Sequence, residues 1–334
     1  MVGLDNGGTA NNATVMTPTG EYLVDRLVEV PSRVIEGPDV AVDALVEALD
    51  AVLALLALDR SEVRAVGLDT PGPASADGVI SSRGSTNFGH PGWRGFDVRT
   101  ALEERLGIPV VYNNDGNAAA LYAHFRHYGL EAPLRSSVSA IVGTGLGGGL
   151  VEAGSIVKGA AGMAGELGHV LLPTDGLLAE GQPMPGCNCG QSGDVESFAS
   201  LTGIQLNLLS YWLSQFPDHE LAGVDPATAA RQVRGYGERF DPMAIKIFEQ
   251  QARALGRLFN IASNFTDPHA YFVGGGVIEA APEFREWFLR TVEEATSLRD
   301  EQRHLVHFAI VPDLDMAGAR GSAIAALSAL AAKP

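Results

Sequence analysis

Two glycine-rich turns, each preceded by an apolar strand, constrain the fold of this chain more than any other feature. The first follows the strand-like segment 2–4 and reads Asp5-Asn6-Gly7-Gly8-Thr9, and the second follows 138–142 and reads Gly143-Thr144-Gly145-Leu146-Gly147-Gly148-Gly149. After each turn the pattern again predicts a strand, the later one at 150–152. This repetition predicts two related halves. Glycine turns of this kind also let backbone N–H groups approach a phosphate closely.

Length and charge limit the classes of protein to which the chain can belong. A chain of 334 residues predicts about two domains. Strands alternate with helices, the clearest of them at 38–58 and 242–264, which indicates an α/β architecture. The chain has 23 Lys plus Arg against 40 Asp plus Glu, a net charge of −17, and it has no basic patch, so we expect no nucleic-acid partner. A bound phosphate would then be held by backbone N–H groups and a divalent metal.

The sequence gives no sign of a membrane protein or a secreted one. It has no run of about 18 apolar residues, so we expect no membrane span. It begins at once with a strand-like segment and leaves no room for a signal peptide, so we expect a cytoplasmic protein. The two cysteines, Cys187 and Cys189, are separated by one residue and are poorly placed for an ordinary disulfide. They form a metal site or have no special role.

The second turn formally satisfies the dinucleotide fingerprint G-x-G-x-x-G at Gly143, Gly145 and Gly148. A dinucleotide-dependent oxidoreductase is therefore one hypothesis. That fingerprint requires a helix immediately afterwards, whereas a strand is expected here. Glu166 lies near the spacing of the ribose carboxylate, but it sits in a glycine-rich loop, and a Walker A sequence is absent.

Five motifs, taken in order, resemble the ROK family of bacterial sugar kinases and sugar-responsive repressors. The motifs are Asp5 to Thr9, Asn114-Asp115-Gly116-Asn117-Ala118-Ala119-Ala120, Gly143 to Gly148, Gly165-Glu166-Leu167-Gly168-His169, and Cys187-Asn188-Cys189-Gly190-Gln191-Ser192-Gly193-Asp194-Val195-Glu196. The resemblance implies a two-lobed, actin-like (ribonuclease H-like) sugar kinase fold with an interlobe cleft that closes over ATP and a hexose. We expect a small lobe from 1–118 together with the C-terminal helix 318–334. A large lobe at 119–317 would carry a metal-type loop at 186–196.

The resemblance also implies roles for individual residues. Asp115 would be the catalytic base that takes the proton from the sugar 6-hydroxyl; its ordinary alternative is the N-cap of a helix expected at 118–128. Asp5 would hold the Mg²⁺ of MgATP. The residues implied for ATP and phosphate are Gly7, Gly8, Thr9, Gly143, Thr144, Gly145, Gly147, Gly274, Gly275 and Gly276. The residues implied for the sugar are Asn87, Asn114, Asp115, Glu166, His169 and Glu196.

A zinc site is implied with one departure from the family pattern. The zinc-bearing branch of the family has a third cysteine where this chain has Asp194. His169, Cys187, Cys189 and Asp194 still offer four ligands that Zn²⁺ accepts, because a carboxylate oxygen is a suitable ligand. Alternatively, Asp194 is only the N-cap of the following helix and the two thiols are free.

Taken together, the sequence predicts an ATP-dependent hexokinase, with glucokinase as the leading candidate, that forms a homodimer or homotetramer. The main alternative is a ROK transcriptional regulator. That class carries a helix-turn-helix domain before the first glycine turn, and Asp5 lies too near the start of this chain for such a domain. The motifs do not report which hexose is the substrate.

Overall fold

The computed structural model describes residues 1–72, 74–81, 88–311 and 313–331. The chain forms two compact units, which are considered separately below. Unit 1 contains Met1–Arg135, Gly149–Gly165 and the C-terminal segment from Asp313, whereas unit 2 contains Ser136–Gly148 and Glu166–Pro312. The expected lobe boundary after residue 118 falls inside a helix of unit 1, whereas unit 1 continues to Arg135.

Unit 1 is built on a five-stranded sheet of order β3-β2-β1-β4-β5. The strands are β1 (Val2–Asn6), β2 (Ala10–Val15), β3 (Val28–Pro31), β4 (Val66–Thr70) and β5 (Val110–Asn114). β1 pairs antiparallel with β2 and parallel with β4, and β4 pairs parallel with β5. The helices are α1 (Pro38–Leu55), α2 (Val98–Leu106), α3 (Asp115–Tyr128) and α11 (Ala317–Ala331). The ends of three parallel strands thus meet at one edge of the sheet, where ligands of open α/β sheets commonly bind.

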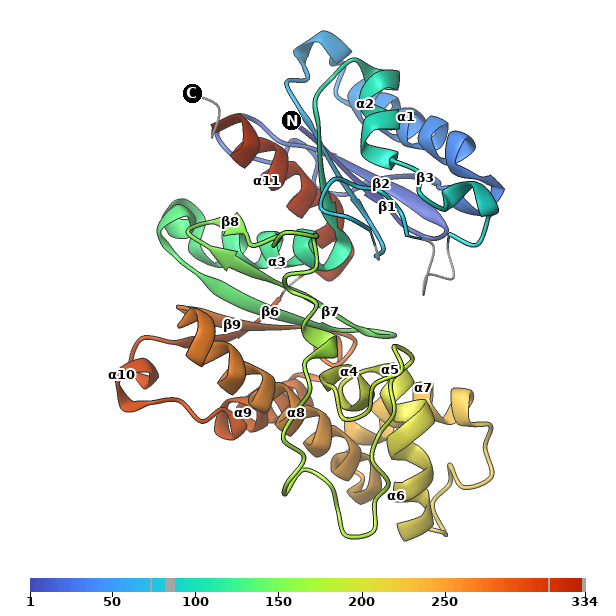
Figure 1. Cartoon of the computed structure of the whole chain (residues 1–334), viewed down its shortest axis with the longest axis vertical. Helices are drawn as coiled ribbons and strands as arrows, with labels where there is room; N and C mark the ends of the chain where they lie inside the picture. Colours follow the sequence, from blue (N-terminus) through green and yellow to red (C-terminus); the bar gives the residue numbers. More distant parts are fainter. Residues whose placement is uncertain (73, 82–87, 312, 332–334) are drawn as a thin grey trace. The chain divides into compact units, whose positions relative to one another are not determined.

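The two faces of this sheet are covered differently (Figure 1). α1 and α2 pack on one face over a core of branched aliphatic residues such as Leu45 and Leu68. α11 lies on the other face and packs against α3 through small residues. Its close approach requires Gly67 in β4, because a Cβ there would collide with the backbone oxygen of Ser322. The helix α11, which is rich in small residues, therefore lies directly on β1 and β4. The ends of these strands carry residues of the candidate site described below.

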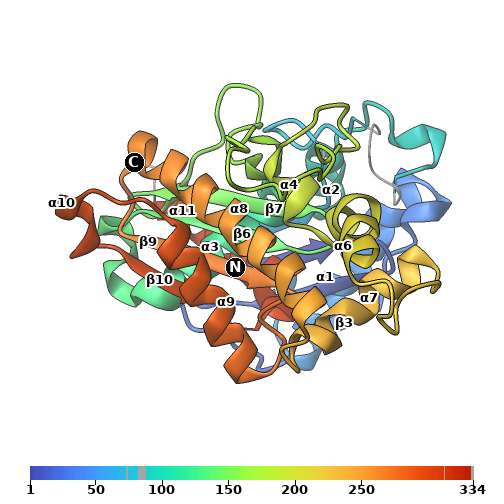
Figure 2. The same cartoon turned by 90° about the horizontal axis from the view of Figure 1, so that it is seen from below.

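The second sheet has the order β10-β9-β6-β7-β8; unit 2 contains β6, β9, β10 and the start of β7, whereas the rest of β7 and β8 belong to unit 1. The strands are β6 (Ser137–Val142), β7 (Leu146–Glu152), β8 (Ser155–Ile156), β9 (Ala270–Gly275) and β10 (His307–Ile310). The helices are α4 (Val195–Phe198), α5 (Leu201–Gly203), α6 (Leu209–Gln215), α7 (Pro226–Gly237), α8 (Pro242–Thr266), α9 (Pro282–Ala295) and α10 (Asp300–Arg303). Figure 2 shows the long amphipathic helix α8 running alongside α9, with which it packs.

The α/β architecture and the repeated strand–turn–strand pattern are confirmed, and one strand boundary needs correction. The later strand of the second repeat begins at Leu146 rather than at residue 150, so Gly147 to Gly149 lie in β7 and not in the turn. Gly148 is needed inside the strand because a Cβ there would collide with the backbone oxygen of Ser139. Among the described residues, no helix combines the length and apolar character needed to cross a membrane.

Candidate functional site

Asp115 is the first residue of α3, directly after β5. The N-cap of this helix is its neighbour Asn114, whose Oδ1 accepts the N–H of Asn117 at 2.7 Å. The capping alternative considered for Asp115 therefore belongs to Asn114, and α3 begins three residues earlier than expected. Asp115 is exposed, and its Oδ1 lies 2.7 Å from the N–H of Gly116. A carboxylate in this position is accessible to a substrate hydroxyl and is stabilised by the positive end of a helix.

The first glycine turn joins β1 to β2 beside Asp5. The turn is closed by a hydrogen bond from the N–H of Gly7 to the carbonyl oxygen of Ala10 (2.9 Å). Asn12 on β2 donates from Nδ2 to Oδ2 of Asp5 at 3.0 Å. Burial raises the pKa of Asp5, and the Asn12 hydrogen bond offsets part of that rise. Asp5 is thus a carboxylate held in place at the strand end, which is what a divalent cation requires of a ligand.

A second carboxylate, Asp69, lies beside Asp5 and was not singled out from the sequence. The two residues are direct partners in the parallel pairing of β1 with β4. Asp69 is fully buried, and its pKa is raised well above its usual range by burial and then by the charges of Asp5 and Asp115. The only available signal was the position of each aspartate, since both directly follow a buried strand segment.

Unit 1 also has a small polar hollow of about 10 Å³ beside the start of α3. Its lining includes Ser75, Asn113, Asn114, Asn117 and Lys158. Nδ2 of Asn113 and Oδ1 of Asn117 are buried there without a hydrogen-bond partner among the described residues. Lys158 donates from Nζ to the carbonyl oxygen of Tyr112 at 2.5 Å. Buried amides without partners mark a place where a polyhydroxylated ligand can supply the missing hydrogen bonds. Asn113, Asn117 and Lys158 are further lining residues that the motif comparison did not assign.

The second glycine turn joins β6 to β7 in unit 2. The N–H of Gly143 donates to the carbonyl oxygen of Gly145 (2.9 Å), and the N–H of Thr202 donates to that of Thr144 (3.1 Å). Glu196 accepts the N–H of Leu146 on Oε2 at 2.8 Å. The predicted sugar ligand Glu196 therefore contacts the glycine turn directly. No dinucleotide fingerprint is formed here, because β7 and not a helix follows the turn.

The glycine run at 274–276 ends β9 next to this second turn. Gly274 and Gly275 are paired with Ile141 and Val142 of β6, and the N–H of Gly276 donates to the carbonyl oxygen of Val142 at 3.0 Å. Two of the stretches expected to contact ATP thus meet at one edge of the unit 2 sheet. Gly147, expected in the turn, is instead an exposed residue of β7.

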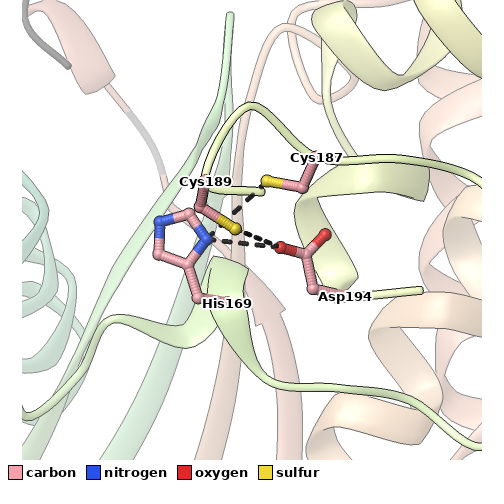
Figure 3. A group of neighbouring side chains, drawn as sticks. All are labelled: His169, Cys187, Cys189 and Asp194. Atoms are coloured by element: carbon pink, nitrogen blue, oxygen red, sulfur yellow. Dashed lines mark hydrogen bonds and ion pairs between the residues drawn. The ribbon is translucent and has the colours of Figure 1, made fainter. Parts of the chain in front are cut away.

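The four predicted metal ligands converge in unit 2 (Figure 3). The ligand atoms of His169, Cys187, Cys189 and Asp194 all lie within 4.8 Å of one another. Nδ1 of His169 is 3.3 Å from Oδ2 of Asp194, and Sγ of Cys189 is 3.5 Å from the same oxygen. One nitrogen, two sulfurs and one oxygen form a ligand set that suits tetrahedral Zn²⁺.

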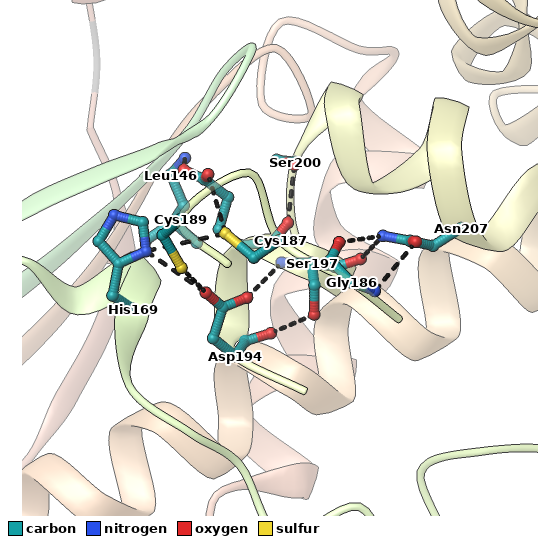
Figure 4. A network of polar contacts seen from close by, with 10 residues as sticks. Leu146, His169, Gly186, Cys187, Cys189, Asp194, Ser197, Ser200 and Asn207 are labelled. Atoms are coloured by element: carbon teal, nitrogen blue, oxygen red, sulfur yellow. Dashed lines mark hydrogen bonds and ion pairs between the residues drawn. The ribbon is translucent and has the colours of Figure 1, made fainter. Parts of the chain in front are cut away.

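Asp194 caps α4 with one carboxylate oxygen and directs the other toward the predicted metal ligands. Its Oδ1 accepts the N–H of Ser197 at 2.9 Å and caps α4, while its Oδ2 faces His169 and Cys189. Figure 4 shows how the surrounding loop is fixed. Asn207 accepts the N–H of Gly186 on its side-chain oxygen at 3.1 Å and donates from Nδ2 to the carbonyl oxygen of Ser197 at 2.9 Å.

We call His169, Cys187, Cys189 and Asp194 the cysteine cluster. The side chain of Glu196 links this cluster to the second glycine turn. Sγ of Cys187 lies 3.6 Å from Oε1 of Glu196, whose other oxygen accepts the N–H of Leu146. The pKa of the Cys187 thiol is raised by burial and then by its hydrogen bond with Asp194. Zn²⁺ would reverse this tendency, because a coordinating thiol is deprotonated. A metal in the cluster would therefore also set the position of Glu196.

The remaining predicted sugar ligands are less informative. Glu166 is half-buried and immediately precedes the short helix Leu167–His169, which carries the histidine of the cluster. Asn87 lies outside the described residues. Asn114 and Asp115 belong to unit 1, whereas Glu166, His169 and Glu196 belong to unit 2.

Solved structures with the same fold include sugar kinases and a ROK family transcriptional regulator. A ROK hexokinase from Thermus thermophilus matches with a TM-score of 0.77 at 30% identity, covering 100% of this chain and 99% of that one. A ROK family glucokinase from Streptomyces griseus, in complex with glucose and AMPPNP, matches with a TM-score of 0.68 at 26% identity, covering 98% and 99%. The chain thus has the actin-like sugar kinase fold that the motifs implied.

Sequence relatives identify the family. The profile of the ROK family matches residues 1–329. A glucokinase of Halalkalibacterium halodurans is 32% identical over 84% of this chain and 81% of the relative. An N-acetylmannosamine kinase of Escherichia fergusonii is 32% identical over 82% of each. This chain belongs to the ROK family, as the resemblance predicted.

Proposed function

We propose that this protein, an ATP-dependent sugar kinase of the ROK family, phosphorylates a hexose on its 6-hydroxyl, with glucose as the first candidate. The observation that carries the proposal is the exposed carboxylate of Asp115 at the start of α3, beside a polar hollow with unsatisfied amides. Glucose is favoured because the relatives that match most of this chain include a glucokinase. The relative that acts on N-acetylmannosamine makes that sugar the second candidate.

In the proposed reaction, Asp115 accepts the proton of the 6-hydroxyl while that oxygen forms a bond to the γ-phosphorus of ATP. The bond between the γ-phosphorus and the bridging oxygen breaks, and ADP leaves. Asn114 fixes the start of α3 and so orients the base, and the buried amides of the hollow hydrogen-bond the sugar hydroxyls. A positioned carboxylate base typically contributes about 10²–10⁴-fold to such a rate.

The nucleotide would be held mainly by backbone groups, as the acidic composition requires. We assign the amides of the two glycine turns, around Gly7 and Gly145, to the phosphates. Asp5 is placed for the Mg²⁺ that accompanies ATP, and this ion would neutralise charge on the β- and γ-phosphates. Gly274 to Gly276 would run beside the adenosine.

We further propose that the cysteine cluster holds Zn²⁺ in a structural role. The ligand set suits the ion, and Asp194 provides an oxygen without giving up its helix cap. Zinc would fix the loop that carries His169 and Glu196 and would not contact the phosphates. Elemental analysis of purified protein should give about one zinc per chain, and substoichiometric zinc would count against the site.

A coupled assay of ADP release tests the substrate. Glucose, mannose, fructose, allose, N-acetylmannosamine and N-acetylglucosamine are compared at equal concentration, and phosphorus NMR identifies the phosphorylated position. Glucose should give the highest kcat/KM. A higher value for an N-acetylated sugar would replace glucose but keep the kinase. Absence of ADP with every sugar would favour the alternative, a sugar-responsive regulator without catalytic activity.

A further inference from the structure

We propose that Asp69 is a second protein ligand, alongside Asp5, of a divalent cation that this protein binds even without nucleotide. The proposal concerns a residue that the kinase reaction described above leaves without a role. Only the use of this cation in ATP binding rests on the proposed function.

The geometry brings the two carboxyl groups together. Asp5 and Asp69 are paired in register on adjacent parallel strands, so their side chains leave the sheet on the same face. Cγ of Asp5 and Oδ2 of Asp69 each lie 2.8 Å from the position that a Cβ on Gly318 would occupy. The two atoms are therefore no farther apart than twice that distance. One cation with oxygen ligands at about 2.0–2.6 Å can contact both groups.

Asp69 has no other partner that would explain its burial. It is 0% exposed, and neither carboxylate oxygen has a hydrogen-bond partner of normal geometry among the described residues. The hydroxyl of Ser322 on α11 lies close enough to Asp69 to offset a small part of the rise in its pKa, but the two groups form no hydrogen bond of normal geometry. The ionised form of a buried carboxyl group without a hydrogen bond or counter-ion is strongly unfavourable, and this is why the pKa of Asp69 is raised. A bound cation removes that penalty.

The negative charges around Asp5 and Asp69 also favour a bound cation. Asp115 adds a third negative charge that acts on Asp69, and no ion pair found in the described part of the chain involves Asp5 or Asp69. The start of α11 lies against both groups, but a helix N-terminus offers only about half a positive charge. Asp5 is partly exposed and gives the ion a way in.

The amide of Asn12 completes the arrangement by fixing one side of Asp5. It donates to Oδ2 of Asp5 from β2, while Asp69 approaches from β4 on the other side. Asp5 is thus held between a neutral donor and a second carboxylate. Two carboxylates bind a free cation more tightly than one, because affinity rises with ligand charge. The protein would then carry its cation before ATP arrives, and the phosphates would join an ion already in place.

A titration with Mn²⁺ tests the site without any kinase activity. The chelator-treated full chain is titrated in the absence of nucleotide, and free Mn²⁺ is measured by electron paramagnetic resonance. Asp69→Asn preserves shape and removes the charge. Asp25→Asn is the matched control, since it removes an exposed carboxylate of the same unit, and Cys187→Ser removes a ligand of the cysteine cluster.

Wild type, Asp25→Asn and Cys187→Ser should bind one Mn²⁺ in unit 1 with the same affinity, and Asp69→Asn should bind it at least about 10-fold more weakly. Asp69→Asn should also melt no earlier than wild type in chelator, and it should lose the rise in Tm that Mn²⁺ gives wild type. A purely structural residue would instead lower Tm in chelator.

Unchanged Mn²⁺ affinity in folded Asp69→Asn would overturn the proposal, as would absence of Mn²⁺ binding by wild type. If Asp69→Asn does not fold, Gly318→Ala replaces it, because its methyl group would occupy the space between the carboxyl groups; unchanged affinity in that variant would equally overturn the site. Release of ADP is measured separately, so loss of the kinase hypothesis would leave the cation result standing.

Discussion

The two glycine turns of this molecule each connect two consecutive strands but have opposite relations to their carboxylates. In unit 1, Asp5 and Asp69 come from the ends of adjacent strands, and among the described residues only Asn12 donates a side-chain hydrogen bond to the pair. In unit 2, the single carboxylate of Glu196 comes from α4 and accepts the N–H of Leu146 at the turn itself. The carboxylates beside the first turn are thus available for the proposed cation, whereas the carboxylate at the second turn holds a backbone N–H group.

This difference shows how an acidic chain can bind a nucleotide. A cation-binding turn neutralises phosphate charge, while a rigid turn presents amides that need no counter-ion. The two tasks require different supports, and the residues that face the two turns differ accordingly. The predictions below test this division of roles.

Asp115→Asn should give the largest effect on activity, because Asp115 is the proposed catalytic base. The residue lies in unit 1. We expect kcat to fall about 10³-fold or more, since the amide cannot accept the proton. The helix should be unaffected, because Asn114 and not Asp115 provides the N-cap. Steady-state kinetics measure the loss.

Sugar binding provides the control for this variant. The dissociation constant for glucose, measured by calorimetry, should change by less than about 3-fold, because an amide still hydrogen-bonds a hydroxyl. A variant that keeps near-normal kcat would disprove the role of Asp115 as base.

Alanine in the two turns should give unequal losses of stability. A Cβ on Gly7 would lie 2.7 Å from the backbone oxygen of Ala10, which cannot move without opening the turn. A Cβ on Gly145 would lie 2.5 Å from Oε2 of Glu196, the end of a flexible side chain. We expect Gly7→Ala to lower the free energy of unfolding by about 2–3 kcal/mol and Gly145→Ala by about 1 kcal/mol, for one lost hydrogen bond.

Denaturant unfolding of the two variants, at the same protein concentration, measures this comparison. Equal losses would mean that Glu196 is as rigid as backbone, and the proposed difference between the turns would then be wrong. Gly20→Ala is unsuitable as a control because Gly20 has a positive φ of 87°. Gly186→Ala is suitable, because a Cβ there meets no atom within 4 Å and its φ is ordinary.

The sequence was sufficient to predict the fold class because the informative signals are local. Apolar segments followed by glycine turns predicted β1 and β6 and their turns, and the motifs identified the family. The predicted ends of helices and strands were wrong where local sequence signals compete. Residues 22–30 resemble a strand, yet only Val28–Pro31 forms β3. The cap of α3 was considered for Asp115, whereas Asn114 provides it, and both residue types are good caps.

The candidate site was predictable only where a motif carried it. Asp69 becomes interesting through its register with Asp5, a long-range pairing that neither residue signals alone. The sequence also presented the cap and ligand roles of Asp194 as alternatives, because it does not show that the two oxygens of one carboxylate point to different partners. Three-dimensional pairing, rather than residue type, decides these cases.

Asp194→Asn should separate those two roles in the cluster that supports the second turn. Asparagine is as good an N-cap as aspartate, so the Tm of the zinc-free protein should stay within about 2 °C of wild type. Loss of the charged ligand should weaken Zn²⁺ binding about 10–100-fold, measured by competition with a chromophoric chelator. Wild-type zinc affinity in this variant would exclude Asp194 as a ligand, and a large fall in Tm would mean that the cap needs the charge.

Substitution of Glu196 should give the smallest effect. It decides whether this residue supports the binding of ATP or the binding of sugar. Glu196→Gln keeps an oxygen that can accept the N–H of Leu146, whereas Glu196→Ala removes it. If Glu196 mainly holds the turn, Glu196→Ala should raise the KM for ATP up to about 10-fold, in proportion to one charge-assisted hydrogen bond, and Glu196→Gln should change it by less than about 2-fold. The KM for sugar should change little in either variant. If the sugar KM rises instead, and equally in both variants, Glu196 acts as the sugar ligand that the family motif implies, and the contrast between the two turns then rests on backbone contacts alone.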